Sequence, residues 1–155
     1  MVSINNYRLL QAYGGLMDAS GSQVIADANE VQLGTMDASF GPTAYNTTLA
    51  ADFDDITVTN SGIYEIVFET NSHNGEEGTT LYKVRSGGTV ITGMQCLVAN
   101  SATAADFSMF KTVAIRGYAS LAAGAVIDVS VTCSSACTLT LNNTRLTVRR
   151  VSATF

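Results

Sequence analysis

The sequence predicts an all-β protein, an antiparallel sandwich of two sheets with about ten strands. Apolar side chains recur with a period of two along most of the chain, which is the spacing of strands with one buried face. Turn-forming pairs rich in Gly, Asn and Ser separate these runs at short intervals. The stretch "SMFKTVAIRGYASLAAG" comes nearest to a helical pattern, but Val113, Ile115 and the break at Gly117 favour a strand there as well.

A length of 155 residues suits one domain whose core needs neither a disulfide nor a metal. We assign residues 1–11, "MVSINNYRLLQ", to an N-terminal arm and residues 12–155 to the domain. The first fifty residues have the weakest alternation. The stretch "GPTAYNTTLAADFDD" at 41–55 holds the only proline, Pro42, and is expected to be a long covering loop.

From residue 56 onward the strands can be followed in order by their alternation. The expected inward rows are Ile56 and Val58; Tyr64, Ile66 and Phe68; Met94, Cys96 and Val98; Ile127, Val129, Val131 and Cys133; and Leu139 and Leu141. Leu146 and Val148 then lie on the opposite parity. We therefore predict a bulge or bend at Asn142–Asn143, because one extra residue returns the later side chains to the inward face.

Two hairpins are predicted from their turns. "VRSGGTV" has a Gly-Gly turn, where a positive φ costs little. "VTCSSACTLT" reads as a second hairpin with a three-residue loop, which would place Cys133 opposite Cys137. A disulfide between them is one possibility. A buried thiol is the other, because Cys133 continues an inward apolar row.

One strand, "GIYEIVFE", is apolar on both faces. Ile63 and Val67 lie opposite the inward row that begins at Tyr64. A second apolar face needs a second partner, which we expect to be a neighbouring subunit; the alternative is a cover from "GPTAYNTTLA" of the same chain. The candidate interface residues are Ile63, Val67, Tyr64 and Tyr118.

The charge pattern excludes several partners. The net charge is −5, only 14% of residues are charged, and the only basic pair is Arg149–Arg150. Nucleic acid binding needs clustered cations, so we expect none. No signal-peptide pattern or membrane-spanning apolar run is present, so we expect a soluble protein made in a cytoplasm, with no membrane partner and reduced cysteines.

Candidate chemical sites are few. His73 is the only histidine and would have to serve any Ser–His–Asp triad, but "NSHNGEEG" predicts a solvated loop. The acids Asp52, Asp54 and Asp55, or Glu76–Glu77, could hold a cation, yet the spacing of a calcium loop is missing. We expect a protein that is not an enzyme, with no cofactor and no metal.

Three segments in order resemble the tumour necrosis factor and complement globular-head superfamily, over roughly residues 12–151: "SGIYEIVFETN", "LYKVRSGGTVI", and "ASLAAGAVIDVSV" running into "LTLNNTRLTVRRV". The matching residues are Gly62, Tyr64 and Phe68 in a Gly-x-Tyr-x-x-x-Phe strand, Leu121 and Gly124 in a strand opener where Ala125 replaces the usual Asp, and Leu146, Val148 and Arg149–Arg150 in the closing strand. The resemblance implies a ten-stranded jelly roll that associates as a trimer.

The function expected from this reading is structural. Small, acidic, stand-alone jelly rolls of this kind resemble the decoration, or cement, proteins on tailed-phage capsids, whose trimers bridge capsomers. That implies a homotrimer on the virion exterior, bound to the major capsid protein. The arm residues Val2, Ile4, Tyr7 and Arg8 are candidates for the contact with the shell. The alternatives are a receptor-binding tip of a tail fibre or spike, and a carbohydrate-binding jelly-roll module.

Overall fold

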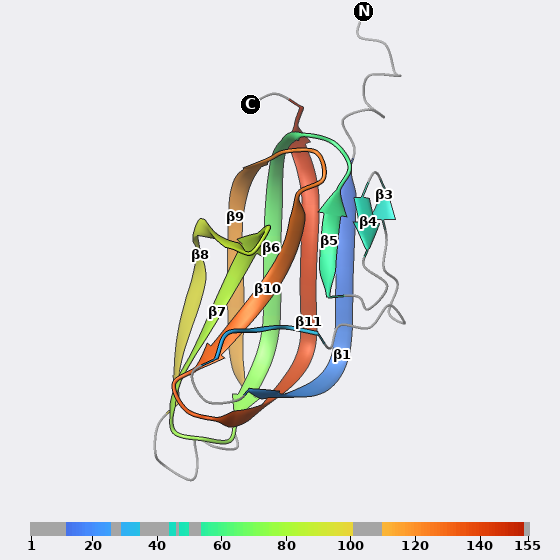
Figure 1. Cartoon of the computed structure of the whole chain (residues 1–155). Helices are drawn as coiled ribbons and strands as arrows, with labels where there is room; N and C mark the ends of the chain where they lie inside the picture. Colours follow the sequence, from blue (N-terminus) through green and yellow to red (C-terminus); the bar gives the residue numbers. More distant parts are fainter. Residues whose placement is uncertain are drawn as a thin grey trace, which may run out of the picture.

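The computed structural model describes residues 12–25, 29–34, 44–45, 47–49, 54–100 and 110–153 (Figure 1). The N-terminal arm predicted at 1–11 lies outside these ranges. The described strands are β1 (Tyr13–Ile25), β2 (Val31–Gln32), β3 (Ala44–Tyr45), β4 (Thr47–Leu49), β5 (Asp55–Val58), β6 (Gly62–Asn74), β7 (Gly78–Ser86), β8 (Thr89–Asn100), β9 (Lys111–Leu121), β10 (Val126–Cys133) and β11 (Cys137–Ser152). Within the described residues there is no helix that could cross a membrane.

Two antiparallel sheets form the sandwich. Sheet A has the order β3-β1-β11-β6-β9, and sheet B has the order β4-β5-β10-β7-β8, with β2 pairing with β10. The long strands β1, β11 and β6 run side by side in Figure 1. The chain passes repeatedly between the sheets, so that β6, β9 and β11 belong to sheet A while β5, β7, β8 and β10 belong to sheet B. This confirms the predicted two-sheet, all-β jelly roll.

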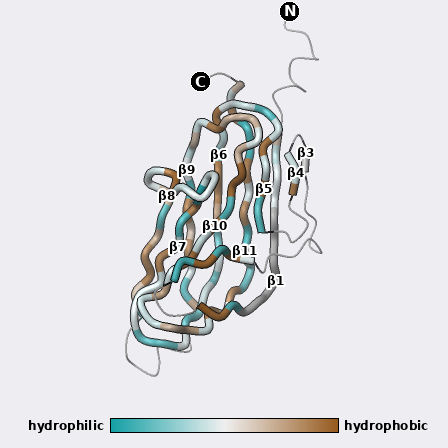
Figure 2. Tube along the Cα trace, in the orientation of Figure 1, coloured by the Kyte–Doolittle hydropathy of each residue, from teal (hydrophilic) through white to brown (hydrophobic). Residues whose placement is uncertain are grey.

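The core includes the rows that the period of two predicted, with Cys96 and Val98 only partly buried beside it. Tyr64, Ile66 and Phe68 of β6 have no exposed surface, and they face the equally buried rows of β7 and β10. The rings of Phe68 and Tyr82 lie 6.0 Å apart across the sandwich. Figure 2 shows the alternation of apolar and polar residues along these strands. Burial of one face of each sheet is what stabilises a sandwich, at about 25 cal/mol for each Å² of apolar surface.

Two local predictions are confirmed. The β7–β8 hairpin turns at Gly87 and Gly88, whose φ values are 55° and 79°. The register of β11 against β6 shifts between Asn142 and Arg145, with Asn143 at φ 52°. The extra residue returns Leu146 and the residues that alternate with it to the core, where Leu146 is fully buried.

The second predicted hairpin is wrong. β10 ends at Cys133 in sheet B, and β11 begins at Cys137 in sheet A, so residues 134–136 carry the chain from one sheet to the other. Cys133 pairs with Thr80, and Cys137 pairs with Ile25. A turn signal in a sequence says that the chain reverses but not which sheet receives the next strand.

The N-terminal third is more regular than its sequence indicates. The stretch "YGGLMDASGSQVI" lacks alternation and so does not predict a strand, yet it forms β1 and pairs with β11 from Tyr13 to Ile25. The predicted loop at 41–55 contains β3, β4 and the first residue of β5, so this prediction is wrong for its described part. β3 extends the edge of β1, and β4 extends the edge of β5.

Candidate oligomerisation face

The candidate site is the outward surface of sheet A, which we call the A-face. It comprises outward positions of β1, β11, β6 and β9, and the pairing register aligns them in rows across the sheet. One row is Tyr13–Arg149–Glu65–Tyr118, and the next is Gly15–Thr147–Val67–Arg116. Ile63, Glu69, Ala114, Ser120 and Arg145 complete the A-face.

The apolar part of the A-face lies at its centre and its rims. Ile63 and Val67 are half-buried, Tyr118 is 61% exposed and Tyr13 is 42% exposed. The described part of the segment proposed as an alternative cover, residues 44–45 and 47–49, does not reach β6. In the sheet order β3 is separated from β6 by β1 and β11, and β4 belongs to sheet B.

The prediction that Tyr64 lies at the interface is wrong. Its side chain has no exposed surface, and its hydroxyl donates a hydrogen bond of 2.6 Å to the carbonyl oxygen of Asn60. The residue therefore belongs to the core of its own subunit, as its place in the inward row requires. Ile63, Val67 and Tyr118 remain available on the A-face.

A charged cluster lies between the aromatic rims. Glu65 accepts hydrogen bonds from Arg116 Nε at 2.9 Å, from Arg149 Nη2 at 2.6 Å and from the Tyr118 hydroxyl at 3.3 Å. The Glu65 side chain is only 8% exposed, whereas both arginine side chains are 66% exposed. Hydrogen bonds from Arg116, and then from Arg149, hold the pKa of Glu65 below its ordinary value against the opposing effect of burial.

A second ion pair extends this cluster along the sheet. Arg145 Nη2 lies 2.6 Å from Glu69 Oε2, and both side chains are roughly half-exposed. With three arginines and two glutamates, the A-face carries one net positive charge in a chain whose net charge is −5. Each arginine contacts a glutamate within the sheet, with Arg116 and Arg149 sharing Glu65, so a partner that covers this face meets ion pairs and one excess positive charge.

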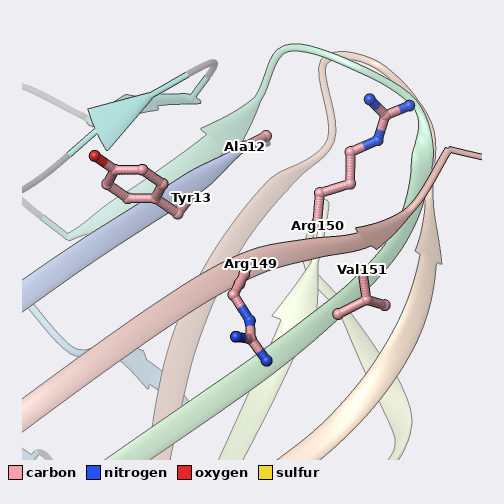
Figure 3. A pocket seen from close by; sticks show the side chains of 5 residues that line it. All are labelled: Ala12, Tyr13, Arg149, Arg150 and Val151. Atoms are coloured by element: carbon pink, nitrogen blue, oxygen red, sulfur yellow. The ribbon is translucent and has the colours of Figure 1, made fainter. Parts of the chain in front are cut away.

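The two side chains of the basic pair Arg149–Arg150 leave β11 in different directions. Figure 3 shows the two side chains pointing away from each other. Arg149 reaches Glu65 on the A-face, whereas Arg150 donates a hydrogen bond to the carbonyl oxygen of Ser61. Together with Ala12, Tyr13 and Val151, the two arginines line a cavity of about 470 Å³ at the end of sheet A.

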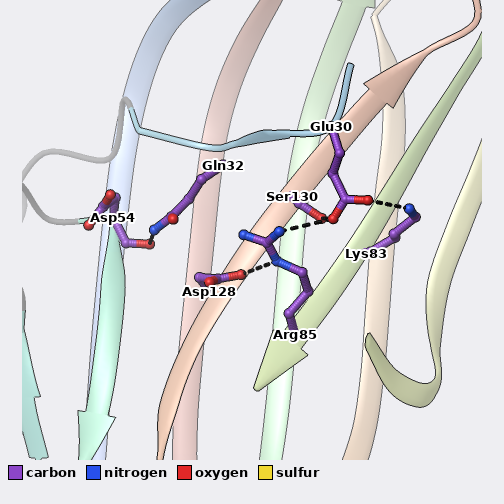
Figure 4. Close-up of polar contacts among 7 residues, drawn as sticks. All are labelled: Glu30, Gln32, Asp54, Lys83, Arg85, Asp128 and Ser130. Atoms are coloured by element: carbon purple, nitrogen blue, oxygen red, sulfur yellow. Dashed lines mark hydrogen bonds and ion pairs between the residues drawn. The ribbon is translucent and has the colours of Figure 1, made fainter. Parts of the chain in front are cut away.

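Part of the outer surface of sheet B is covered by residues 29–34 of the same chain (Figure 4). Glu30 accepts hydrogen bonds from Lys83 Nζ at 2.6 Å, from Arg85 Nη1 at 2.9 Å and from Ser130 Oγ at 2.8 Å (Figure 4). Arg85 Nε also pairs with Asp128 at 2.6 Å. The Lys83 and Ser130 hydrogen bonds lower the pKa of Glu30 to about 2. This cluster fastens residues 29–34 across sheet B.

The loop predicted around His73 is wrong. β6 continues to Asn74, and His73 pairs with Thr140 on the same outward side as the A-face. Its ring packs 5.7 Å from that of Phe110, and its Nε2 atom is buried without a hydrogen-bond partner among the described residues. His73 is therefore a strand residue whose ring packs on Phe110, and not a residue of a solvated loop.

The predicted acidic sites are spread out. Asp52 lies outside the described residues, and Glu76 and Glu77 lie exposed in the bend after β6. In the part of the chain that the structure describes, no group of three His, Cys, Asp or Glu residues is close enough to hold a metal ion. The expectation of no metal remains a prediction.

Comparison with known proteins supports the fold. No family model and no curated protein matches the chain. The crystal structures of murine APRIL at pH 5.0 and pH 8.0 match with TM-scores of 0.64 and 0.61, at 14% identity, over 91% of this chain and 99% of theirs. The structure of Eiger TNF from S. frugiperda matches with a TM-score of 0.56, at 13% identity, over 94% of both chains.

The fold is therefore a jelly roll of the tumour necrosis factor type. The family resemblance seen in the sequence is confirmed at the level of the fold. A resemblance to phage decoration proteins is not shown by these matches.

Sequence reasoning missed the Glu65–Arg116–Arg149 cluster. The available signal was Glu65, an acid between Tyr64 and Ile66 in the apolar part of the strand. Its two partners lie on strands far away in sequence, so only the register of the sheet could identify them.

Proposed function

We propose that this protein is a non-catalytic structural module that works as a homotrimer, with the A-face buried between copies. The observation that carries the proposal is the state of the A-face. It combines half-exposed aliphatic residues, two exposed tyrosines and a set of ion pairs that are already satisfied within one subunit. Exposed apolar surface of this kind is typical of interaction sites, where aromatic and arginine side chains are enriched.

The trimeric state is supported by the family resemblance, which implies trimers, and by the geometry of closed assemblies. A contact that repeats around a three-fold axis joins two different surfaces of the same chain and leaves no open end. Copies that use the A-face in this way would cover Ile63 and Val67. That would give the doubly apolar strand β6 its second partner.

We further propose that the trimer is a decoration protein on the exterior of a tailed-phage capsid, where it binds the major capsid protein and bridges capsomers. The acidic, low-charge composition supports this placement by analogy. The arm residues Val2, Ile4, Tyr7 and Arg8 remain candidates for the contact with the shell. No role for nucleic acid or a membrane is part of this proposal.

The test has two separate parts. Sedimentation equilibrium should give a trimer at micromolar concentration, and a clean monomer would contradict the use of the A-face. For the capsid, the protein should copurify with intact particles at a fixed ratio to the shell protein. Deletion of residues 1–6 should weaken binding to undecorated shells while leaving the trimer intact. Full-strength binding by the deleted protein would remove the arm from the contact.

A carbohydrate-binding role is the second candidate, and one surface feature favours it. A groove of about 420 Å³ lies between the β7–β8 hairpin and β9, lined by Tyr118 and several hydroxyl side chains, Ser86, Thr89, Thr92 and Ser120. Aromatic rings beside hydroxyl groups suit sugars. Retention on a glycan array that is lost in Tyr118→Ala would favour this role, or that of a receptor-binding tip, over a capsid role.

A further inference from the structure

Two cysteines meet at one end of the sandwich, inside it. Cys133 is the last residue of β10 in sheet B, and Cys137 is the first residue of β11 in sheet A. Both face the core, with 1% and 6% of their surface exposed. Their sulfur atoms lie 2.6 Å apart.

The distance between the two sulfur atoms is much shorter than the distances from Cys133 Sγ to its polar neighbours. Asn74 Nδ2 and Thr80 Oγ1 lie 3.8 Å and 3.7 Å from Cys133 Sγ, which are ordinary distances for hydrogen bonds to sulfur. The distance between the two cysteine sulfurs is much closer to the ~2.05 Å of a covalent bond. Only a small movement of the side chains would bring the two sulfurs within bonding distance.

We propose that Cys133 and Cys137 form a disulfide that links sheet A to sheet B at this end of the sandwich. The proposal is independent of the trimer and of the capsid role. The bond would enclose the exposed crossing at 134–136 in a small ring. It would also fix the neighbouring bend after β6, where the backbone N–H of Glu76 donates to Asn74 Oδ1 at 3.0 Å.

The chemistry balances with oxidised glutathione as the oxidant. One cysteine loses its proton and attacks the glutathione disulfide, which gives a mixed disulfide and releases one glutathione thiolate. The second cysteine then loses its proton and displaces the other glutathione. The protein loses two hydrogens in all, and both are recovered in two molecules of reduced glutathione.

The surroundings indicate when the bond forms. Burial, and then the contact with Cys133, raises the pKa of the Cys137 thiol to about 12, so little thiolate is present in the folded chain near neutral pH. Little of either sulfur is accessible to an oxidant. The bridge should therefore form while the chain folds and resist reduction afterwards. Cys96, half-buried on β8, provides an internal reference thiol.

The experiment compares the full chain refolded with a glutathione redox pair and with an excess of dithiothreitol. Each sample is alkylated in denaturant, and the mass of the intact protein is measured by mass spectrometry. The oxidised sample should carry one alkyl group, at Cys96, and the reduced sample three. Peptide mapping should recover residues 133 and 137 in one linked fragment. Three alkyl groups after oxidising refolding, or a bridge that includes Cys96, would overturn the proposal.

A stability measurement gives a second readout. Closing so short a ring should raise the melting temperature of the oxidised protein by on the order of 5 °C over the reduced one. The double variant Cys133→Ser/Cys137→Ser should show no difference between the two conditions, and Cys96→Ser should keep the full difference. An equal shift in the double variant would mean that the oxidant acts elsewhere.

Discussion

Val67→Lys tests the proposed use of the A-face most directly. Val67 lies near the middle of β6, between Thr147 on β11 and Arg116 on β9. It is half-exposed in the isolated subunit, so a lysine there can reach water in a monomer. Its ammonium would lie beside Arg116, and a pair of like charges across a strand costs at most about 1 kcal/mol. The monomer should therefore still fold.

In a trimer the same change is far more costly. Covering the rest of Val67 would contribute about 1 kcal/mol, and burying an ammonium without a partner costs about 2 kcal/mol or more. Three equivalent contacts then lose about 9 kcal/mol together. Since each 1.4 kcal/mol is a factor of ten, the association constant for three monomers forming one trimer falls about a million-fold. The concentration at which half of the trimer dissociates varies as the inverse square root of that constant, so it rises about a thousand-fold.

The assay is sedimentation equilibrium over a range of concentrations, with circular dichroism to verify the fold. The matched control is Leu81→Lys. Leu81 is also a half-buried aliphatic residue on an outward strand position, but it lies in sheet B. The control should stay trimeric. A Val67→Lys protein that remains trimeric at the wild-type concentration, or a control that dissociates equally, would refute the use of the A-face.

Three further predictions concern stability. Acidification from pH ~4.5 to ~2 should lower the melting temperature of the wild type more than that of Glu30→Gln. The pKa of Glu30 is lower in the folded protein than in the unfolded chain, so its contribution to stability is present above the unfolded pKa and is lost as the pH falls through the folded pKa. Parallel pH profiles of the two proteins would contradict this. Gly62→Ala should lower the free energy of unfolding by about 2–3 kcal/mol, because Gly62 has a φ of 156° and a Cβ added there would overlap the carbonyl oxygen of Ser152. Gly75→Ala is the control, because a Cβ at Gly75 would meet open space, and its free energy of unfolding should stay within about 0.5 kcal/mol of the wild-type value. His73→Ala should cost about 1 kcal/mol in urea denaturation, because it removes the ring that packs on Phe110; no loss would mean that the position behaves as the solvated loop that the sequence indicated.

The sequence by itself determined most of the fold. A period of two is a local property of a strand, so the inward rows could be read without knowing the partners. Tyr64, Phe68 and Val129 are buried as that period requires. The slip of parity at Asn142–Asn143 was enough to predict a bulge or a bend there, because side chains in a regular strand keep to alternate faces. The Gly-Gly turn was readable because positive φ is a property of single residues.

The tertiary structure alone decided which strands are neighbours. β1 contains three glycines and its apolar residues do not alternate, so its own residues do not predict a strand; it is ordered by pairing with β11. His73 is part of β6 because β11 pairs with that strand as far as Asn74, well beyond its apolar half. Cys133 and Cys137 meet across two sheets instead of within a hairpin. Arg116 and Arg149 reach Glu65 from strands 51 and 84 residues away in sequence. Hydrogen bonds between strands join residues that are remote along the chain, and a single sequence records each strand without recording its partner.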